Sequence, residues 1–264
     1  MEKTERLNTI LDLLAAEGSV LVENIVTSLG VSPATARRDL DALAAQRLLT
    51  RTRGGATMEA VAYDLPARYS RDDNSPQKQA IARAASALVP KGSVVGLCGG
   101  TTSTAIAQVL GMRPDLMEPS SKPALTVVTN AINIAAQLVV RPNIRIMVTG
   151  GVVNPRSYEL VGPYTDVILQ RVALDIAFIG VNGLDPDVGP TVSDEGEAEV
   201  NALMARRASE TYIVADSSKI GTRNFATMTG YIFSNLITDS GITADQKAAF
   251  EARGTRVIVA PDRP

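Results

Sequence analysis

Apolar residues recur every three or four positions over most of the first 45 residues, which is the spacing of one face of an α-helix. This pattern predicts a helix over residues 7–16 and a second helix over residues 22–29, which Gly30 can close with a left-handed turn. A third helix is expected after Ser32, a good N-cap, with Pro33 at its first position. Two short helices joined by a tight glycine turn form a helix-turn-helix unit.

The stretch LLTRTRGGATM after the third helix predicts a two-stranded hairpin that turns at Gly54-Gly55 and forms a wing. Five arginines and two aspartates lie between residues 34 and 53, a local charge of +3. Arginines near the start of a recognition helix can read guanine edges or hold phosphates. We therefore expect DNA contacts from the helix and the wing, through Ser32, Ala34, Thr35, Arg37, Arg38, Arg51 and Arg53.

The string GVSPATARRDLDAL followed by LLTRTRGGA resembles the N-terminal signature of the DeoR family of bacterial transcriptional regulators. The match covers residues 5–57, with Arg53 where many family members carry histidine. A small helical bundle with a solvated basic face would account for one arginine pair, but it accounts poorly for the order helix, turn, helix, wing. The resemblance implies that residues 1–57 form a winged helix-turn-helix domain that binds double-stranded operator DNA.

The pattern changes twice after the hairpin. Residues 58–76 contain prolines and clustered charges without periodicity, which is typical of a linker. In residues 77–264, near-continuous apolar strands alternate with helices, which predicts a larger α/β domain with a mostly parallel sheet. The strands are expected at 93–98, 125–129, 144–148, 175–180, 212–215, 236–238 and 257–259, and helices at 78–89, 131–139 and 243–253.

Ligands of parallel sheets bind outside the carboxyl ends of the strands. The stretch GLCGGTTSTAIAQVL joins a strand to a helix N-terminus through two glycines and two threonines, an arrangement suited to an anion. Glycines, amides and a lysine follow other strands, although each alone is also typical of a turn, an N-cap or a solvated lysine. We expect a phosphorylated ligand to be held at this edge by Gly99, Gly100, Thr101, Thr102, Thr129, Asn130, Gly150, Gly151, Asn182 and Lys219.

A second series of strings resembles, in order, the DeoR-type sensor domain, whose fold is similar to that of ribose-5-phosphate isomerase: CGGTTSTAIAQVL, VVTNAINIAAQL, TGGVV, LVGPYT, DIAFIGVNGLD, EAEV and ADSSKIGTRNFA. The resemblance implies a repressor of carbohydrate-metabolism genes controlled by a sugar phosphate, with residues 100–102 around the phosphate and Lys219 as a charge partner. Gln77 stands before Lys78 where glutamate is frequent, and Asn201 stands where lysine often follows the EAEV stretch.

Several residue types needed for catalysis are missing. The chain has no histidine, which excludes histidine-activated nucleophiles and ordinary histidine-containing zinc sites. The related isomerases carry Asp-Gly-Ala-Asp where this chain reads IGVN at 179–182, and neither isoleucine nor asparagine is a general base. Glu195, Glu197 and Glu199 are interpreted as solvated residues that favour a helix dipole. We expect a sensor without catalytic residues, metal or cofactor; the alternatives are an isomerase-like or CoA-transferase-like enzyme with an appended DNA-binding domain, and an interaction module without a ligand.

Composition adds expectations about location and assembly. The 264 residues carry a net charge of −2, and the start MEKTERLNTILDLL is charged and amphipathic, unlike a signal peptide. The single cysteine, Cys98, lies in an apolar strand pattern and is interpreted as a buried small hydrophobe. We expect a cytoplasmic protein with no membrane partner. One small helix-turn-helix rarely binds DNA tightly alone, so a homo-oligomer, dimer or tetramer, is expected.

Overall fold

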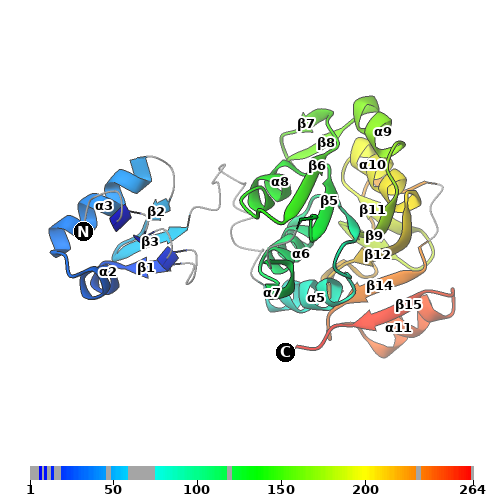
Figure 1. Cartoon of the computed structure of the whole chain (residues 1–264). Coiled ribbons are helices and arrows are strands. Elements are labelled where there is room, and N and C mark those ends of the chain that lie inside the picture. Colours follow the sequence, from blue (N-terminus) through cyan, green and yellow to red (C-terminus); the bar gives the residue numbers. More distant parts are fainter. Residues whose placement is uncertain are drawn as a thin grey trace. The chain divides into compact units, whose positions relative to one another are not determined.

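The computed structural model describes residues 6–7, 9–10, 13–14, 19–45, 49–58, 75–117, 121–229 and 233–262. The chain divides into two compact units, residues 1–64 and residues 65–264 (Figure 1). Within the described residues, no helix has the length and apolarity that crossing a membrane requires.

The N-terminal unit combines helices with a small antiparallel sheet. Its helices are α2 (Val22–Leu29) and α3 (Pro33–Ala45), and residues 6–7, 9–10 and 13–14 are also helical. The other positions of the predicted first helix lie outside the described residues. The sheet has the order β1-β3-β2, and a cluster of fully buried side chains, including Ile10, Ile25 and Leu40, joins it to the helices. Its strands are β1 (Ser19–Leu21), β2 (Leu49–Arg51) and β3 (Gly55–Met58).

The turn between α2 and α3 is built as predicted. Gly30 has a φ of 63°, and its N–H donates to the carbonyl oxygen of Val26 at 3.0 Å. The Ser32 side chain accepts from the Thr35 N–H at 3.1 Å, so it caps α3. The helix-turn-helix is therefore confirmed.

The hairpin turns slightly earlier than predicted, over residues 52–54, and Gly55 belongs to β3. The reason is β1, a strand that the sequence pattern did not predict, which pairs with β3. A Cβ on Gly55 would lie 1.9 Å from the carbonyl oxygen of Val20. Glycine at position 55 thus permits a strand contact, whereas Gly54 lies in the turn.

The C-terminal unit is built on a seven-stranded sheet in the order β15-β14-β12-β9-β4-β5-β6. Every pair of neighbouring strands in it is parallel, which confirms the predicted parallel sheet. The chain builds outward in both directions from the adjacent pair β4 and β9. The strands are β4 (Val94–Leu97), β5 (Leu125–Thr129), β6 (Ile144–Val148), β9 (Leu174–Gly180), β12 (Ala208–Val214), β14 (Asn235–Thr238) and β15 (Arg256–Val259).

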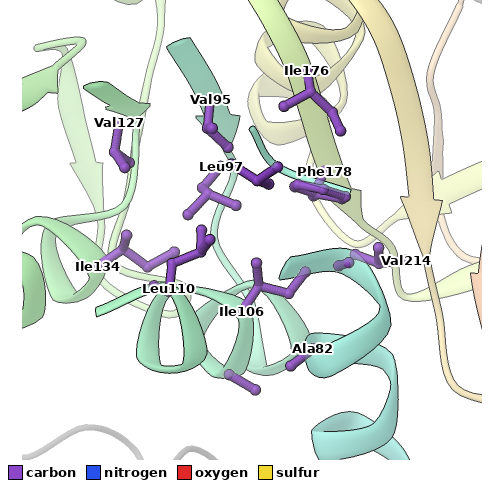
Figure 2. Packing of buried hydrophobic residues seen from close by; sticks show 14 of the residues in the cluster. Ala82, Val95, Leu97, Ile106, Leu110, Val127, Ile134, Ile176, Phe178 and Val214 are labelled. Atoms are coloured by element: carbon purple, nitrogen blue, oxygen red, sulfur yellow. The ribbon is translucent and has the colours of Figure 1, made fainter. Parts of the chain in front are cut away.

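Helices cover both faces of this sheet (Figure 1). On one face, side chains of α5, α6 and α8 pack against alternate residues of β4 and β9; Figure 2 shows Ile106 and Leu110 close to Leu97 and Phe178. Side chains of α9, α10 and α11 form the core of the other face. The helices are α5 (Pro76–Ala87), α6 (Thr101–Gly111), α8 (Ile132–Leu138), α9 (Pro163–Leu169), α10 (Glu195–Arg206) and α11 (Ala244–Glu251), with a short α7 (Pro114–Met117) after α6.

Short elements absent from the sequence prediction surround the carboxyl edge of the sheet. They have two to four residues each, too few for a clear apolar alternation. One is the antiparallel hairpin of β7 (Val152–Asn154) and β8 (Glu159–Val161). The others are a three-stranded sheet of β10 (Gly183–Asp185), β11 (Gly189–Val192) and β13 (Ala226–Thr227), and the 3-10 turn η1 (Ser217–Lys219).

Candidate functional site

A cavity of about 780 Å³ opens at the carboxyl end of the parallel sheet. It lies where β4 and β9 end, the point at which the strand order reverses and where such sheets bind ligands. Loops after β4, β9 and β12 form one part of its wall, and the β7–β8 hairpin and the start of α10 form another. The lining residues are Lys78, 99–102, 154–157, Glu159, Val161, 180–182, 192–194, Glu197, Asn201, Ala215, Asp216 and Lys219.

The loop from β4 to α6 contributes Gly99, Gly100, Thr101 and Thr102 to this wall, as the sequence predicted for their position. Gly100 precedes α6 with a φ of 99°, a conformation that favours glycine. No side chain in the described part of the chain caps this helix, so its first N–H groups keep their hydrogen-bonding capacity for a ligand. The helix N-terminus carries the positive end of the helix dipole, which favours an anion.

Three cationic side chains line the cavity. Lys219 was predicted, and Lys78 and Arg156 were not. Lys78, from the first turn of α5, is buried, and its Nζ lies 3.9 Å from Asp216 Oδ2. Lys78 could have been identified from the sequence, because the resemblance to the sensor family includes this position. Arg156 could not, because it lies in the turn of a hairpin that the sequence pattern did not predict.

Besides Asp216, two further buried carboxyl groups line the cavity, Glu159 on β8 and Glu197 on α10. Asn130 Nδ2 donates to Glu159 Oε2 at 3.0 Å, and Asn154 Nδ2 donates to Glu197 Oε1 at 2.9 Å. Burial, and then the negative charge of Glu197, raises the pKa of Glu159 to about 8. The interpretation of Glu197 as a solvated residue was wrong, because the β7–β8 hairpin covers this face of α10; Glu195 and Glu199 are exposed as expected.

Four predicted residues do not line the cavity: Thr129, Asn130, Gly150 and Gly151. Thr129 and Asn130 are fully buried, and the Thr129 hydroxyl accepts from the Ala131 N–H at 3.0 Å. Asn130 instead holds Glu159. Gly150 and Gly151 form a turn at which the Thr165 hydroxyl bonds to the Gly150 carbonyl at 2.7 Å. These positions shape the loops around the cavity rather than its surface.

The end of β9 and the loop after it reach the cavity through residues 180–182. Asn182 lies there as predicted, and its Oδ1 accepts from the Ser193 N–H at 3.1 Å. Ile179 points into the core instead. Cys98 is fully buried, as expected, and burial raises its pKa to about 12.

In the N-terminal unit, α3 presents a basic surface. Ala34, Arg37 and Arg38 are exposed, and neither arginine has an acidic partner among the described residues. Ser32 is exposed and bonded to Thr35. These are the positions that a recognition helix uses to meet DNA.

On the wing, the two arginines differ. Arg53 is exposed in the turn, whereas Arg51 is half-buried. Arg51 Nη1 donates to the Gly55 carbonyl at 2.7 Å, and its Nε lies 2.9 Å from Asp41 Oδ1 on α3. Arg51 therefore links the wing to α3, whereas the exposed side chain of Arg53 is more accessible to a binding partner.

Comparison with known proteins identifies both parts of the chain. Residues 6–60 match the family model of the DeoR-like helix-turn-helix domain, and residues 73–240 match that of the DeoR C terminal sensor domain. The glycerol-3-phosphate regulon repressor of Escherichia coli (strain K12) is 30% identical over 86% of this chain and 87% of that protein. The HTH-type transcriptional regulator GlpR of Haloferax volcanii is 32% identical over 98% of both chains.

A solved structure of D-ribose-5-phosphate isomerase, in complex with phospho-erythronic acid, aligns with 54% of this chain and 52% of its own, at 18% identity and a TM-score of 0.40. The two family models together span most of the sequence, and the relatives align over nearly their whole length. This chain therefore belongs to the DeoR family of DNA-binding transcriptional regulators.

Proposed function

We propose that this regulator is a repressor that binds operator DNA through α3 and the wing and is controlled by a phosphorylated sugar or polyol bound in the cavity of the sensor domain. The observation that carries the effector part is the joint lining of one cavity by an uncapped helix N-terminus and three cationic side chains. Backbone N–H groups and cations together are the usual partners of a phosphate. The name of one relative, a glycerol-3-phosphate regulon repressor, supports this ligand class.

For DNA, we propose direct contacts from Ser32, Ala34, Thr35, Arg37 and Arg38 on α3. Arg53 is proposed to meet a phosphate, and Arg51 to hold the wing in place for it. For the effector, we propose contacts from the loop after β4 and from one amide and two lysine side chains near it. These residues are Gly99, Gly100, Thr101, Thr102, Asn182, Lys78 and Lys219.

We also propose that the cavity binds its ligand without converting it and that the protein acts as a homo-oligomer on paired half-sites. The regulators among its relatives support the first point. The cavity does contain carboxyl groups that could move a proton, so the point needs a direct assay. Incubating the protein with aldose phosphates and following formation of the ketose phosphates tests it; measurable turnover would contradict it.

The main experiment is a thermal-shift screen of the full chain with phosphorylated sugars and polyols, each paired with its unphosphorylated counterpart. A ligand that binds only the native state raises the melting temperature by mass action. We expect a rise with phosphorylated compounds alone. The protein is then titrated with DNA that it selects from random duplexes, in the presence and absence of the active compound. The compound should change the affinity of the protein for this DNA. If no phosphorylated compound raises the melting temperature, the effector proposal is wrong.

A further inference from the structure

The cavity contains a second surface whose chemistry differs from that of a phosphate site. Glu159, Glu197 and Asn201 line it together, and we call these three residues the acceptor wall. Glu197 and Asn201 lie four residues apart on α10 and therefore share one face of that helix. Glu159 reaches the same cavity from β8. All three are buried, with exposed fractions of 5%, 6% and 2% for Glu159, Glu197 and Asn201.

The acceptor wall is held in place by other side chains. Asn154 donates to Glu197 Oε1, and Asn130 donates to Glu159 Oε2. By contrast, Asn201 Oδ1 accepts no hydrogen bond from any residue that the structure describes. A buried acceptor without a donor is costly, and such atoms are normally satisfied by water or by a ligand. Asn201 therefore points to a ligand group that donates a hydrogen bond.

The acceptor wall begins directly beside the anion-binding loop. A Cβ on Gly99 would lie 2.4 Å from Glu159 Cδ, so the glutamate side chain packs on the backbone of that loop. A small molecule with its phosphate on the loop would thus place the carbon atoms next to the phosphate against the acceptor wall. The substituents on those carbon atoms then determine how tightly the molecule binds.

The Glu197 carboxylate and the Asn201 amide oxygen accept hydrogen bonds, and hydroxyl groups can donate to them. Glu159, whose pKa is raised to about 8, holds a proton at pH 7 and is a neutral member of the wall with one acceptor oxygen and one O–H group. An ionised acid group on the ligand offers acceptors only and adds a negative charge beside Glu197. We propose that the acceptor wall selects an effector that carries one phosphate and otherwise neutral hydroxyl groups, and that it rejects phosphorylated sugar acids. This inference rests on the proposed function, because it assumes that the phosphate binds at the loop.

The test compares pairs of compounds that differ only by hydroxymethyl against carboxylate. Suitable pairs are glycerol 3-phosphate with 3-phosphoglycerate, ribitol 5-phosphate with 5-phosphoribonate, and glucitol 6-phosphate with 6-phosphogluconate. Dissociation constants for the full-length protein at pH 7 are measured by calorimetry. In each pair that binds, we expect the acid to bind at least about tenfold more weakly, because like charges meet in a buried site.

Three variants assign the effect to the wall. Glu197→Gln removes the negative charge and keeps an oxygen that can accept from Asn154. It should therefore narrow the difference between the dissociation constants of the acid and the polyol in each pair. Asn201→Ala removes the buried acceptor oxygen and should weaken binding of the polyol more than binding of the acid, so it should also narrow this difference. Glu199→Gln removes a charge from the exposed face of the same helix and should leave the difference unchanged.

The outcomes separate this inference from the proposed function. If the acid binds as tightly as the polyol in the parent protein, the inference is overturned while the phosphate site stands. If the polyol binds more tightly than the acid but Glu197→Gln and Asn201→Ala leave that preference unchanged, the acceptor wall is not its source and the inference is likewise overturned. If no compound of any pair binds, both fail.

Discussion

Arg51 Nε lies 2.9 Å from Asp41 Oδ1, so an ion pair ties the wing of the DNA-binding domain to α3, the helix beside it. Both side chains are partly exposed, and such a pair contributes at most about 1 kcal/mol to the free energy of unfolding. Its main consequence is the position of the wing relative to α3. The two arginines of the wing should therefore respond differently to substitution.

Replacing Arg53 by alanine removes an exposed charge at the tip of the wing. We expect weaker binding to all DNA sequences alike and a salt dependence whose slope, in log–log form, falls by about one ion. Arg51→Ala should also weaken binding, with a smaller change in slope, because part of its guanidinium is engaged by Asp41 and Gly55. Affinities measured between low and moderate salt give both slopes; equal slopes for the two variants would contradict this division of roles.

Arg38 is the residue on α3 that we expect to read a base. Arg38→Ala should lower affinity for the selected DNA by about 1–3 kcal/mol and relax the preference at one base position. Lys247→Ala removes a lysine from α11 in the sensor unit and serves as the charge control. Selection of sites from random duplexes shows the change in preference. An unchanged preference would mean that Arg38 contacts only the DNA backbone or no DNA at all.

The threonines at the start of α6 test the phosphate site. The double substitution Thr101→Val and Thr102→Val keeps the side-chain shape and removes two hydroxyl donors. It should weaken effector binding by about 1–3 kcal/mol while DNA binding without effector stays normal. Thr227→Val, at an exposed position on β13, is the matched control. DNA titrations with and without effector measure how far the effector changes the affinity for DNA. If that change were as large in the double variant as in the parent, the phosphate would bind elsewhere.

Glu159 should make the stability of the sensor domain depend on pH. Its pKa is raised to about 8 by burial and then by Glu197, whereas a glutamate in the unfolded chain titrates near 4.3. Between these values the folded protein holds a proton that the unfolded chain releases, so the free energy of unfolding falls as pH rises, by up to about 1.4 kcal/mol per pH unit.

Glu159→Gln removes this titration and should flatten the slope, so the stability of the variant relative to the parent increases from pH 5 to pH 9. Unfolding in urea at several pH values measures it, with Glu199→Gln as the control. Parallel curves for parent and Glu159→Gln would show that Glu159 is ionised in the folded protein throughout.

Assembly gives a further prediction. We expect light scattering at micromolar concentration to report a dimer or a larger homo-oligomer, because two helix-turn-helix units are needed to meet paired half-sites. A monomer both with and without DNA would contradict it.

Structural features that depend only on residues close together in the sequence could be predicted from the amino-acid sequence alone. Gly30 and Ser32 determine the turn and the cap of α3 through their own backbone and side chain, and the apolar runs identify the seven parallel strands. Gly100 and the threonines after it likewise mark a glycine loop at the start of a helix. In each case the relevant contacts lie within a few residues.

Burial of polar groups depended instead on segments far apart in the chain. The hydrogen bond from Asn154 to Glu197 spans 43 residues, and it forms only because a short hairpin folds over α10. The same hairpin turns Glu159 toward the cavity. Asn130 donates a hydrogen bond to Glu159 and for this reason does not line the cavity as predicted. The packing of separate elements determines which carboxyl groups are buried and which amide side chains line the cavity. Apolar periodicity carries no information about that packing.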